Sequence, residues 1–477
     1  MTRPLIIGGE HRRGVREGET RNPSDLSEVV TTYAMGGARE ARDAVSAASD
    51  ALPGWAAASP EKRHDVLMRA GLDIWDRRQE LGRLLAREEG KLLAEGIGEV
   101  ARAARILQFH AGEALRAGGE RVASVRPGVE VDVRREPVGV VAAIAPWNFP
   151  IAIPAWKIAP ALAHGCTLVL KPAEIVPSLA WELVDALHRA GLPAGVLNLV
   201  SGPGSEVGQA LLDDPRVAAV TFTGSQATGE RVAATCARHM RRVQLEMGGK
   251  NPLVVLDDAD LDLAVDCALE GAFGSTGQRC TASSRLIVQR DIHDRFVEAL
   301  ASRLRAFRVG HALDGESRMG PVASEAQLES NLRYLDVARS EGGHLRTGGG
   351  TAQRPTRGHF MEPALVTETR PEMTINREEV FGPVASVIRV GSYDEALAVA
   401  NDTPFGLSAG ICTTSLRHAS HFKANARAGM VMVNLPTAGV DYHVPFGGTK
   451  GSSLGPREQG RHAVEFFTTV KTAYTLP

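Results

Sequence analysis

The sequence predicts an α/β protein with two domains of mainly parallel sheet, and three observations support this fold class. Short apolar runs alternate with segments of helical periodicity from Pro137 onward. A second alternating region begins near Pro252 and runs to about Thr437. Residues 466–474, close to the end of the chain, alternate like an edge strand. Strands and helices that alternate at this spacing imply parallel strands joined by helical crossovers.

Length and charge narrow the class of protein further. The chain has 477 residues, enough for two to four domains at roughly 100–200 residues each. Lys+Arg total 54 and Asp+Glu total 56, so the net charge of -2 argues against a nucleic-acid partner. No apolar run approaches the ~18 residues of a membrane span. Five scattered cysteines and no signal peptide lead us to expect a cytoplasmic protein.

The first part of the chain, to about Arg116, is rich in Ala, Arg and Glu. Residues 43–51 and 61–85 place apolar side chains at i, i+3 and i+4, so we expect one surface-packed helix in each segment. We assign no chemistry to this region.

The first alternating region supplies four expected strands, at residues 138–145, 166–170, 196–200 and 218–222. The helices between them are expected at residues 155–163, 179–190 and 206–212. Parallel sheets bind ligands just past the carboxyl ends of their strands. The segments that directly follow these strands are therefore the first places to look for a site.

The second region has expected helices at residues 261–272, 294–307 and 325–339. Its apolar runs are at residues 252–256, 286–288 and 385–390, and we expect residues 342–358 to form a Gly-rich surface loop. This pattern predicts a second α/β domain.

Two strand-to-helix turns are candidate phosphate sites. Gly202-Pro-Gly204-Ser-Glu-Val-Gly208 is a loose relative of the dinucleotide fingerprint, and Thr223-Gly224-Ser225 would present backbone N–H groups at a helix start. A P-loop is absent from the sequence, because Gly249-Lys250 is followed by Asn251. The sequence thus favours a nucleotide site without the signature of an ATPase.

Cys280 and Glu246 are the candidate chemical groups. Arg279 and polar residues surround Cys280, a setting that predicts a lowered thiol pKa and a thiolate nucleophile. The other four cysteines lie in apolar or helical patterns typical of small core residues. Glu246 ends an apolar run before two glycines, which suits a general base, although a capping acid fits the same position.

Three other patterns are better explained structurally. Ser408 and Ser453 each lie in a G-x-S-x-G pattern, but neither has the strand before and the helix after that a hydrolase elbow needs. Cys236 and His239 have metal-ligand spacing without a second pair nearby, so we predict no metal site.

Several ordered motifs together resemble the aldehyde dehydrogenase superfamily, from about residue 20 to the C-terminus. The matching segments are Ala145-Pro-Trp-Asn-Phe-Pro150, Lys171-Pro-Ala-Glu174, Phe222-Thr-Gly-Ser225, Leu245-Glu-Met-Gly-Gly-Lys250, Gly277-Gln-Arg-Cys280, Glu378-Glu-Val-Phe-Gly-Pro383 and Pro445-Phe-Gly-Gly448. Met247 is a small departure, since leucine is more usual there.

The resemblance implies a Rossmann-type cofactor domain (1–119 and 137–248), an α/β catalytic domain (249–437) and a small β oligomerisation arm (120–136 and 456–477). Residues 438–455 would return to the cofactor domain and border the substrate tunnel. It also implies a homodimer or homotetramer.

The same resemblance implies an oxidation through a covalent intermediate. Cys280 would attack the aldehyde, and the Asn148 side chain with the Cys280 N–H would hold the oxyanion of the thiohemiacetal. After hydride transfer to the nicotinamide, Glu246 would activate water to hydrolyse the thioester. Because family members that acylate coenzyme A typically lack this base, Glu246 implies a free acid product.

The resemblance also implies the cofactor residues. Lys171 and Glu174 would bind the adenosine ribose, Ser225 the pyrophosphate and Glu379 the nicotinamide ribose, with Phe381 beside the ring. Glu174 favours NAD over NADP, because a carboxylate repels a 2′-phosphate, although NADP stays possible. The remaining expected cofactor contacts are Ala145, Pro146, Trp147, Ala173, Gly204, Phe222, Thr223, Gly224, Met247 and Gly248.

For the substrate, residues 151–157 and 437–460 resemble bacterial 2-oxoglutarate semialdehyde (2,5-dioxopentanoate) dehydrogenases. The expected tunnel residues are Asn148, Phe149, Ile153, Trp156, Arg279, Thr281 and Val440. Succinate semialdehyde, another small semialdehyde or a broad range of aliphatic aldehydes remain alternatives. A cofactor-independent esterase or a non-catalytic binding protein are alternatives from other classes.

Overall fold

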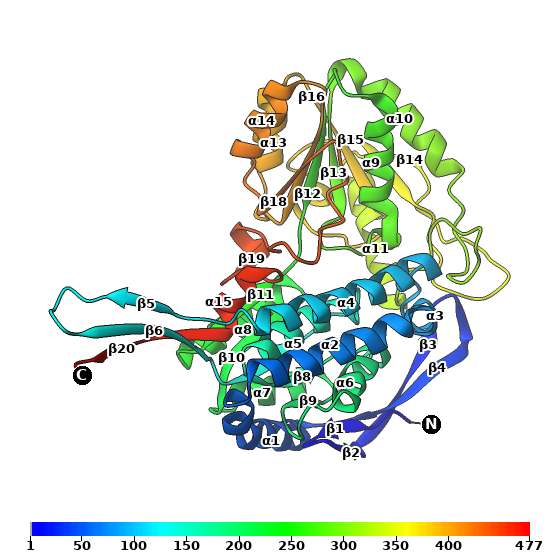
Figure 1. Cartoon of the computed structure of the whole chain (residues 1–477). Helices are drawn as coiled ribbons and strands as arrows, with labels where there is room; N and C mark the ends of the chain where they lie inside the picture. Colours follow the sequence, from blue (N-terminus) through cyan, green and yellow to red (C-terminus); the bar gives the residue numbers. More distant parts are fainter. Residues whose placement is uncertain (1) are drawn as a thin grey trace.

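The chain builds two helix-covered sheets and a projecting β arm, as the computed structural model of residues 2–477 shows (Figure 1). The first sheet has eight strands in the order β19-β11-β10-β7-β8-β9-β1-β2. Its five central strands run parallel, while β1, β2 and β19 pair antiparallel at the two edges. The strands are β1 (Leu5–Ile7), β2 (Glu10–Arg12), β7 (Val140–Ile144), β8 (Thr167–Lys171), β9 (Leu197–Leu199), β10 (Val217–Thr223), β11 (Arg242–Glu246) and β19 (Ser453–Leu454).

Alternate residues of each central strand enter two different cores. In β7, Val141 and Ala143 pack in one core, and Val140 and Ala142 pack in the other. Helices α2, α4, α5 and α6 cover the first face, and α1, α7 and α8 cover the second. Their bounds are α1 (Ala38–Ala56), α2 (Pro60–Asp76), α4 (Leu93–Ala114), α5 (Ala152–Ala163), α6 (Ser178–Arg189), α7 (Gln209–Asp213) and α8 (Gln226–Arg238). Burial on both faces explains why these strands read as continuous apolar runs.

The single helix predicted over residues 61–85 is wrong, because the structure has two. Helix α2 ends at Asp76 and α3 (Arg78–Glu89) begins after Arg77, whose backbone leaves helical geometry at φ -87 and ψ 8. Both helices pack against α4, and the break lets each present its own apolar stripe to it. Sequence periodicity continues through such a turn and does not reveal it.

The N-terminal strands were also not predicted. Besides β1 and β2, the hairpin of β3 (Arg16–Asn22) and β4 (Asp25–Met35) precedes the first helix. These strands are short or mostly polar on one face, so they lack the apolar runs that marked the central strands.

The second sheet has seven strands in the order β14-β15-β16-β13-β12-β17-β18, all parallel except β14. The strands are β12 (Asn251–Val255), β13 (Ser283–Gln289), β14 (His344–Thr347), β15 (Ala364–Thr369), β16 (Val384–Val390), β17 (Ser408–Cys412) and β18 (Met430–Val433). The helices are α9 (Leu261–Phe273), α10 (Arg290–Arg305), α11 (Glu325–Ser340), α12 (Thr374–Arg377), α13 (Tyr393–Asn401) and α14 (Leu416–Asn425). The Gly-rich segment at 342–358 is not all loop, because it contains the edge strand β14.

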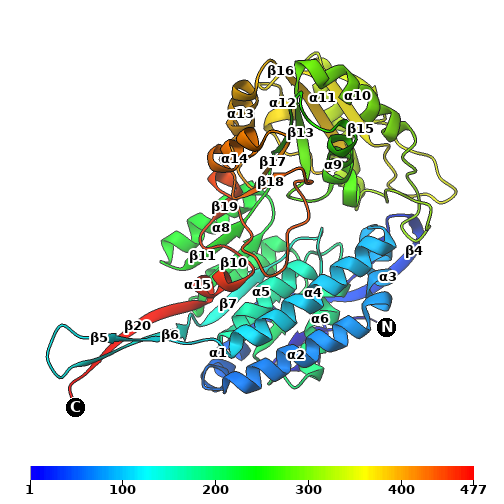
Figure 2. The ribbon, with the colours of Figure 1, turned by 45° about the horizontal axis from the view of Figure 1, so that its top comes forward.

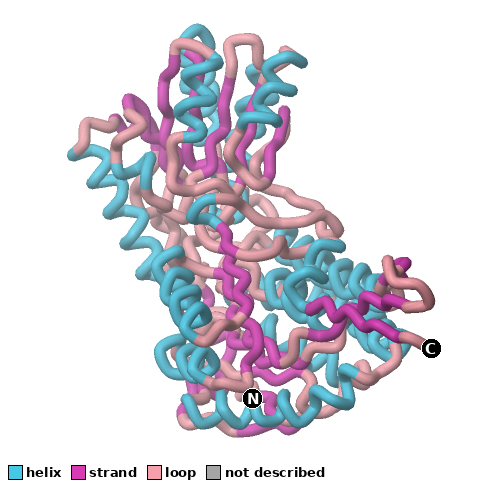
Figure 3. Tube along the Cα trace, turned by 90° about the vertical axis from the view of Figure 1, so that its left-hand side faces the viewer, coloured by secondary structure: helices cyan, strands magenta, loops and turns pink. Residues whose placement is uncertain are grey.

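The arm is a three-stranded antiparallel sheet that extends away from both large sheets (Figures 2 and 3). It contains β5 (Glu120–Ala123), β6 (Glu130–Pro137) and β20 (Thr468–Thr475), and β20 pairs with β6 along its whole length. The C-terminal strand begins two residues later than predicted, because Phe466 and Phe467 lie in the short helix α15 (Val464–Phe467) and are buried in the first core.

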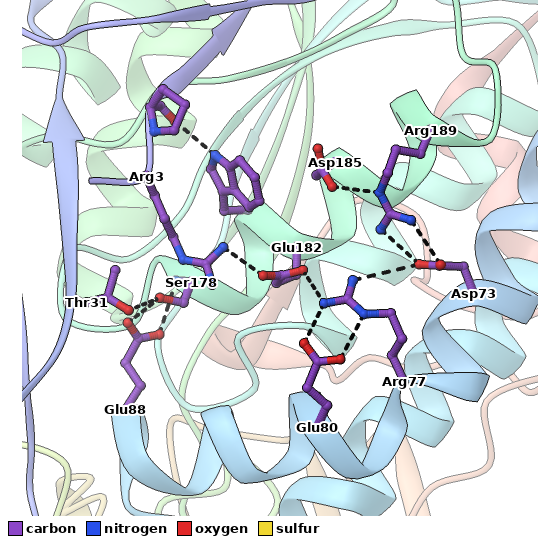
Figure 4. A network of polar contacts seen from close by, with 12 residues as sticks. Arg3, Thr31, Asp73, Arg77, Glu80, Glu88, Ser178, Glu182, Asp185 and Arg189 are labelled. Atoms are coloured by element: carbon purple, nitrogen blue, oxygen red, sulfur yellow. Dashed lines mark hydrogen bonds and ion pairs between the residues drawn. The ribbon is translucent and has the colours of Figure 1, made fainter. Parts of the chain in front are cut away.

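An ion-pair network ties the segment before β1 to α6 and to the junction of α2 and α3 (Figure 4). The Glu182 carboxylate on α6 accepts from Arg3, which precedes β1, and from Arg77 between α2 and α3, each at 2.8 Å. Arg77 also pairs with Glu80 at 2.8 Å. The network holds segments together that are far apart in the sequence.

No helix within residues 2–477 is both long and apolar enough to cross a bilayer.

Candidate active site

Asn148 lies in the turn that follows β7, at the carboxyl end of the strand. Its side chain is buried, and Nδ2 donates to the Gln278 carbonyl at 2.9 Å. The Asn148 carbonyl accepts from Lys91 Nζ at 2.7 Å. The turn is therefore fixed to the loop that follows α9 and to the loop that precedes α4. The second N–H of the Asn148 amide remains available as a donor.

Cys280 is presented by an unusual turn, Gly274–Gly277, that follows α9. Ser275 and Thr276 have φ of 49 and 57, a left-handed conformation that is costly for residues with a side chain. Gly277 continues it at φ +66, and a Cβ there would lie 2.2 Å from the Gly382 carbonyl oxygen. Backbone strain of this kind is common where a functional group must be held in one position.

The predicted lowering of the Cys280 pKa is wrong, and so is its predicted cause. Arg279 points to carboxylates instead, pairing with Glu270 at 2.8 Å and with Glu95 at 3.1 Å. Burial raises the pKa of the Cys280 thiol, and the carboxylates of Glu379 and Glu246 raise it further. The side chain next in sequence therefore does not set the electrostatics of the thiol.

Glu246 is the last residue of β11 and is buried. Its Oε2 accepts from the Ser453 hydroxyl at 2.6 Å. Burial raises the pKa of Glu246 well above its ordinary value, and the nearby Glu458 carboxylate adds to the rise. Glu458 itself is held by Lys157, whose Nζ lies 2.5 Å from Glu458 Oε1. A carboxylate with a raised pKa is a stronger base once it is deprotonated.

One cavity, of about 260 Å³, lies at the carboxyl ends of the first sheet and reaches Cys280. Its wall includes the predicted residues Pro146, Trp147, Asn148, Thr223, Gly224, Ser225, Met247, Gly248, Glu379 and Phe381. Gln327, Ser330 and Tyr334 of α11 also line it, and the sequence did not indicate them. Ile153, expected on the substrate side, touches this cavity too.

The other predicted cofactor residues do not line this cavity: they are Ala145, Lys171, Ala173, Glu174, Gly204 and Phe222. Lys171 ends β8, and its Nζ lies 3.8 Å from Glu174 Oε1. A Cβ on Gly208 would lie 4.0 Å from the Lys171 side chain, so the Gly202–Gly208 segment comes close to this pair.

The first cavity has the features that a dinucleotide requires. Ser225 begins α8, but its hydroxyl bonds to Thr228 Oγ1 (3.1 Å) and does not cap the first backbone N–H groups of the helix. These N–H groups suit a pyrophosphate. At Gly248 a Cβ would lie 2.1 Å from the Glu379 carboxylate, so the backbone and this carboxylate come close together.

Glu379 and Phe381 complete the end of the cavity near Cys280. Glu379 Oε1 accepts from the Gly249 N–H at 2.7 Å, and burial raises the pKa of Glu379 to about 7. Phe381, at φ 58, meets Trp147 edge to face with 5.5 Å between ring centroids. A carboxylate beside an aromatic wall suits a ribose and a flat ring.

A second cavity, of about 300 Å³, reaches Cys280 from the other side. It contains the predicted tunnel residues Phe149, Ile153, Trp156, Arg279, Thr281 and Val440. It is also lined by Lys91, Glu95, Gly98, Glu99 and Arg102, most of them on α4. The first part of the chain, to which we assigned no chemistry, therefore supplies part of the wall of this cavity. Among the described residues 2–477, no cluster of His, Cys, Asp and Glu could hold a metal ion.

Comparisons with known proteins show the family and the fold of the chain. The family model described as "Aldehyde dehydrogenase family" matches residues 11–473. An alpha-ketoglutarate semialdehyde dehydrogenase of Haloferax volcanii is 46% identical over 459 residues, covering 96% of this chain and 95% of the relative. An alpha-ketoglutaric semialdehyde dehydrogenase of Bacillus subtilis is 42% identical over 461 residues, covering 96% and 94%.

A solved structure is similar over the whole chain. The crystal structure of betaine aldehyde dehydrogenase from Staphylococcus aureus in complex with NAD+ has a TM-score of 0.97 and 35% sequence identity. The match covers 100% of this chain and 95% of the other.

Proposed function

Because the chain belongs to the aldehyde dehydrogenase family, we propose that it oxidises 2-oxoglutarate semialdehyde to 2-oxoglutarate with NAD+. The single observation that carries the chemistry is that Cys280 lies on the wall of two cavities at once. One has the features of a dinucleotide site, and the other is open to an aldehyde. The choice of substrate is supported by two relatives named for this semialdehyde, which is also called alpha-ketoglutarate semialdehyde.

In the proposed first half-reaction, Cys280 Sγ forms a bond to the aldehyde carbon, the C=O π electrons move to the oxygen, and the thiol proton passes to solvent water. Asn148 Nδ2 uses one N–H for the Gln278 carbonyl and has a second for the developing oxyanion, which the Cys280 N–H also meets. A preorganised donor of this kind contributes about 10²–10³ in rate. NAD+, when bound, supplies the acceptor for the hydride of this step.

In the proposed second half-reaction, Glu246 removes a proton from water. The resulting hydroxide attacks the thioester carbon, the C–S bond breaks, and the acid and the Cys280 thiol are released. Ser453 keeps the carboxylate of Glu246 in place, through the 2.6 Å hydrogen bond. Hydrolysis rather than acyl transfer follows from having this base beside the nucleophile.

We assign the adenosine ribose to Lys171 and Glu174, the pyrophosphate to the start of α8 at Ser225, and the nicotinamide ribose to Glu379. The Glu174 carboxylate is 3.8 Å from Lys171 and half-exposed. This negative charge favours a 2′-hydroxyl over a 2′-phosphate, so NAD+ should be the better cofactor.

We further propose a cytoplasmic homodimer or homotetramer that assembles through the arm. Val122, Val470 and Tyr474 are exposed on this projecting sheet. All five cysteines are free thiols, as a reducing compartment would keep them. Sedimentation of the full chain should give a species larger than one subunit, and a monomer would refute the assembly.

A substrate panel tests the proposed reaction. The purified chain should reduce NAD+ with a higher kcat/KM for 2-oxoglutarate semialdehyde than for succinate semialdehyde, glutaraldehyde, betaine aldehyde or a plain aliphatic aldehyde. NADP+ should support a lower kcat/KM with each substrate. Cys280→Ala should abolish oxidation. A flat profile, or a preference for uncharged aldehydes, would overturn the substrate assignment, and oxidation by Cys280→Ala would overturn the nucleophile.

A further inference from the structure

The second cavity has three cations on its wall, and two of them are neutralised by nearby carboxylates. Lys91 Nζ lies 2.7 Å from Glu99 Oε2. Burial pulls the pKa of Lys91 down, but the carboxylates of Glu99 and Glu89 outweigh it and leave the pKa above its ordinary value. Arg279 is held by Glu270 and Glu95. Neither cation is free to pair with a substrate.

Arg102 is the third cation, and it has no such partner. In the described part of the chain, Arg102 Nη2 donates to Gln459 Oε1 at 3.0 Å, while the carboxylates of Glu99 and Asp441 act on its charge without a hydrogen bond to it. Glu99, one turn before it on α4, has both oxygens occupied: Oε2 by Lys91, and Oε1 by the N–H groups that start α5. Asp441, the other nearby carboxylate, is an exposed loop residue.

Arg102 lies on the face of α4 that lines the cavity. Glu95, Gly98, Glu99 and Arg102 follow each other at i, i+3, i+4 and i+7, which is one face of a helix. The arginine is about 10 Å along the helix axis from Glu95, at a rise of 1.5 Å per residue. Arg102 therefore lies away from Arg279 and its two carboxylates, and Gly98, which has no side chain, leaves room between the two arginines.

The surroundings of Arg102 contain more donors than acceptors. Its guanidinium lies over the Trp156 ring, 5.9 Å from the centroid. Arg102 Nε, Trp156 Nε1 and Gln459 Nε2 are buried and find no acceptor within residues 2–477. Buried donors without acceptors are costly, and a positive charge among them is costlier. Arg102 and Trp156 line the cavity, whereas Gln459 does not, so an anion with acceptor oxygens beside Arg102 is the ligand that this part of the wall lacks.

We propose that Arg102 is the specificity-determining residue of the tunnel and holds the terminal carboxylate of the aldehyde substrate. The inference rests on the proposed function and narrows it to ω-semialdehydes of short dicarboxylic acids. A 2-oxo acid suits the site well, because its carboxylate and adjacent keto oxygen offer the planar pair of acceptors that a guanidinium fork binds. The same charge repels a trimethylammonium aldehyde.

Arg102→Gln tests this assignment, and Arg105→Gln is its matched control. Arg105 is three residues further along α4, but it is exposed and stacks on Trp75 at 4.2 Å, outside the cavity. In Arg102→Gln, kcat/KM for 2-oxoglutarate semialdehyde should fall about 10- to 100-fold, mainly through KM. With uncharged pentanal, kcat/KM should not fall in this variant. For 2-oxoglutarate semialdehyde, kcat/KM of Arg102→Lys should lie between those of the wild type and Arg102→Gln, because lysine keeps the charge without the guanidinium fork. Arg105→Gln should behave as wild type.

A second measurement keeps the carboxylate site separate from the choice of substrate. Glutarate should inhibit pentanal oxidation by the wild-type chain competitively, and about 10- to 100-fold more weakly in Arg102→Gln. If this holds while succinate semialdehyde is the better substrate, the site stands and the proposed substrate fails. An equal loss with pentanal and the semialdehyde in Arg102→Gln, no loss with either, or no inhibition of wild type by glutarate would each overturn the role of Arg102.

Discussion

The Ser453 hydroxyl donates to Glu246 Oε2 across 2.6 Å, and Ser453 Oγ accepts the Gly448 N–H at 2.7 Å. Glu246 and Ser453 also lie opposite each other in the antiparallel pairing of β11 with β19. A segment that follows the second sheet thus returns to the first and fixes the orientation of a buried carboxylate. Ser453 lies in a pattern that resembles a hydrolase elbow, but its contacts are those of a residue that positions Glu246.

Ser453→Ala should move the pH dependence of turnover. The hydrogen bond from Ser453 lowers the pKa of Glu246, against the larger upward effect of burial. Its loss should raise that pKa, so that less of the base is deprotonated near neutral pH. We expect kcat to fall about 3- to 10-fold at pH 7 and the rising limb of the kcat profile to move to higher pH. Ser453→Thr keeps the hydroxyl and should restore the profile. An unshifted limb in the alanine variant would contradict this role.

Glu246→Gln should separate the two half-reactions. If Glu246 serves only in hydrolysis, the variant should still produce a burst of NADH close to one per subunit, followed by turnover about 10²- to 10⁴-fold slower. Stopped-flow absorbance with an excess of aldehyde measures both phases. Glu246 must be deprotonated to act, and its pKa is raised. As the pH is lowered, wild-type turnover should therefore be lost at a higher pH than a glutamate with an ordinary pKa would give. Absence of the burst would place Glu246 in the first half-reaction.

Much of the fold could be predicted because burial leaves a pattern in the sequence. The strands that end at Ile144, Lys171 and Thr223 are buried on both faces, and the rule for parallel sheets points to the residues at and just past these ends. Local sequence singled out Cys280 and Glu246, and the family resemblance placed them in the steps of an aldehyde oxidation. The break at Arg77 gave no signal, because the apolar periodicity on its two sides is continuous.

The rest of the site depends on contacts between distant segments. Arg279 is next to Cys280 in sequence, but the thiol pKa is set by burial and by Glu379 and Glu246. Arg102 resembles any charged residue of a solvated helix. Its spacing of i+7 from Glu95 was the available clue, and only the packing of α4 against α5 shows that this face lines a cavity.

Glu174→Gln should weaken the preference for NAD+. The carboxylate lies 3.8 Å from Lys171 Nζ, so its removal leaves the lysine charge free for a 2′-phosphate. We expect kcat/KM with NADP+ to rise about 10-fold and that with NAD+ to fall several-fold. Initial rates with both cofactors at a fixed aldehyde concentration give the ratio. Glu174→Asp should keep the wild-type preference, and an unchanged ratio in the glutamine variant would remove Glu174 from cofactor selection.

Glu182→Ala should destabilise the chain more than Glu80→Ala, although both glutamates pair with Arg77. The Glu182 side chain is 10% exposed and accepts from Arg3 as well, so its loss leaves the partly buried Arg3 without a carboxylate and takes one of its carboxylates from Arg77. Glu80 is 64% exposed, and water replaces its contact readily. We expect the free energy of unfolding to fall by about 1–3 kcal/mol for Glu182→Ala and by less than about 1 kcal/mol for Glu80→Ala. Urea titration followed by tryptophan fluorescence and by circular dichroism measures both changes. Equal shifts of the two midpoints would mean that solvent exposure does not decide what these ion pairs contribute.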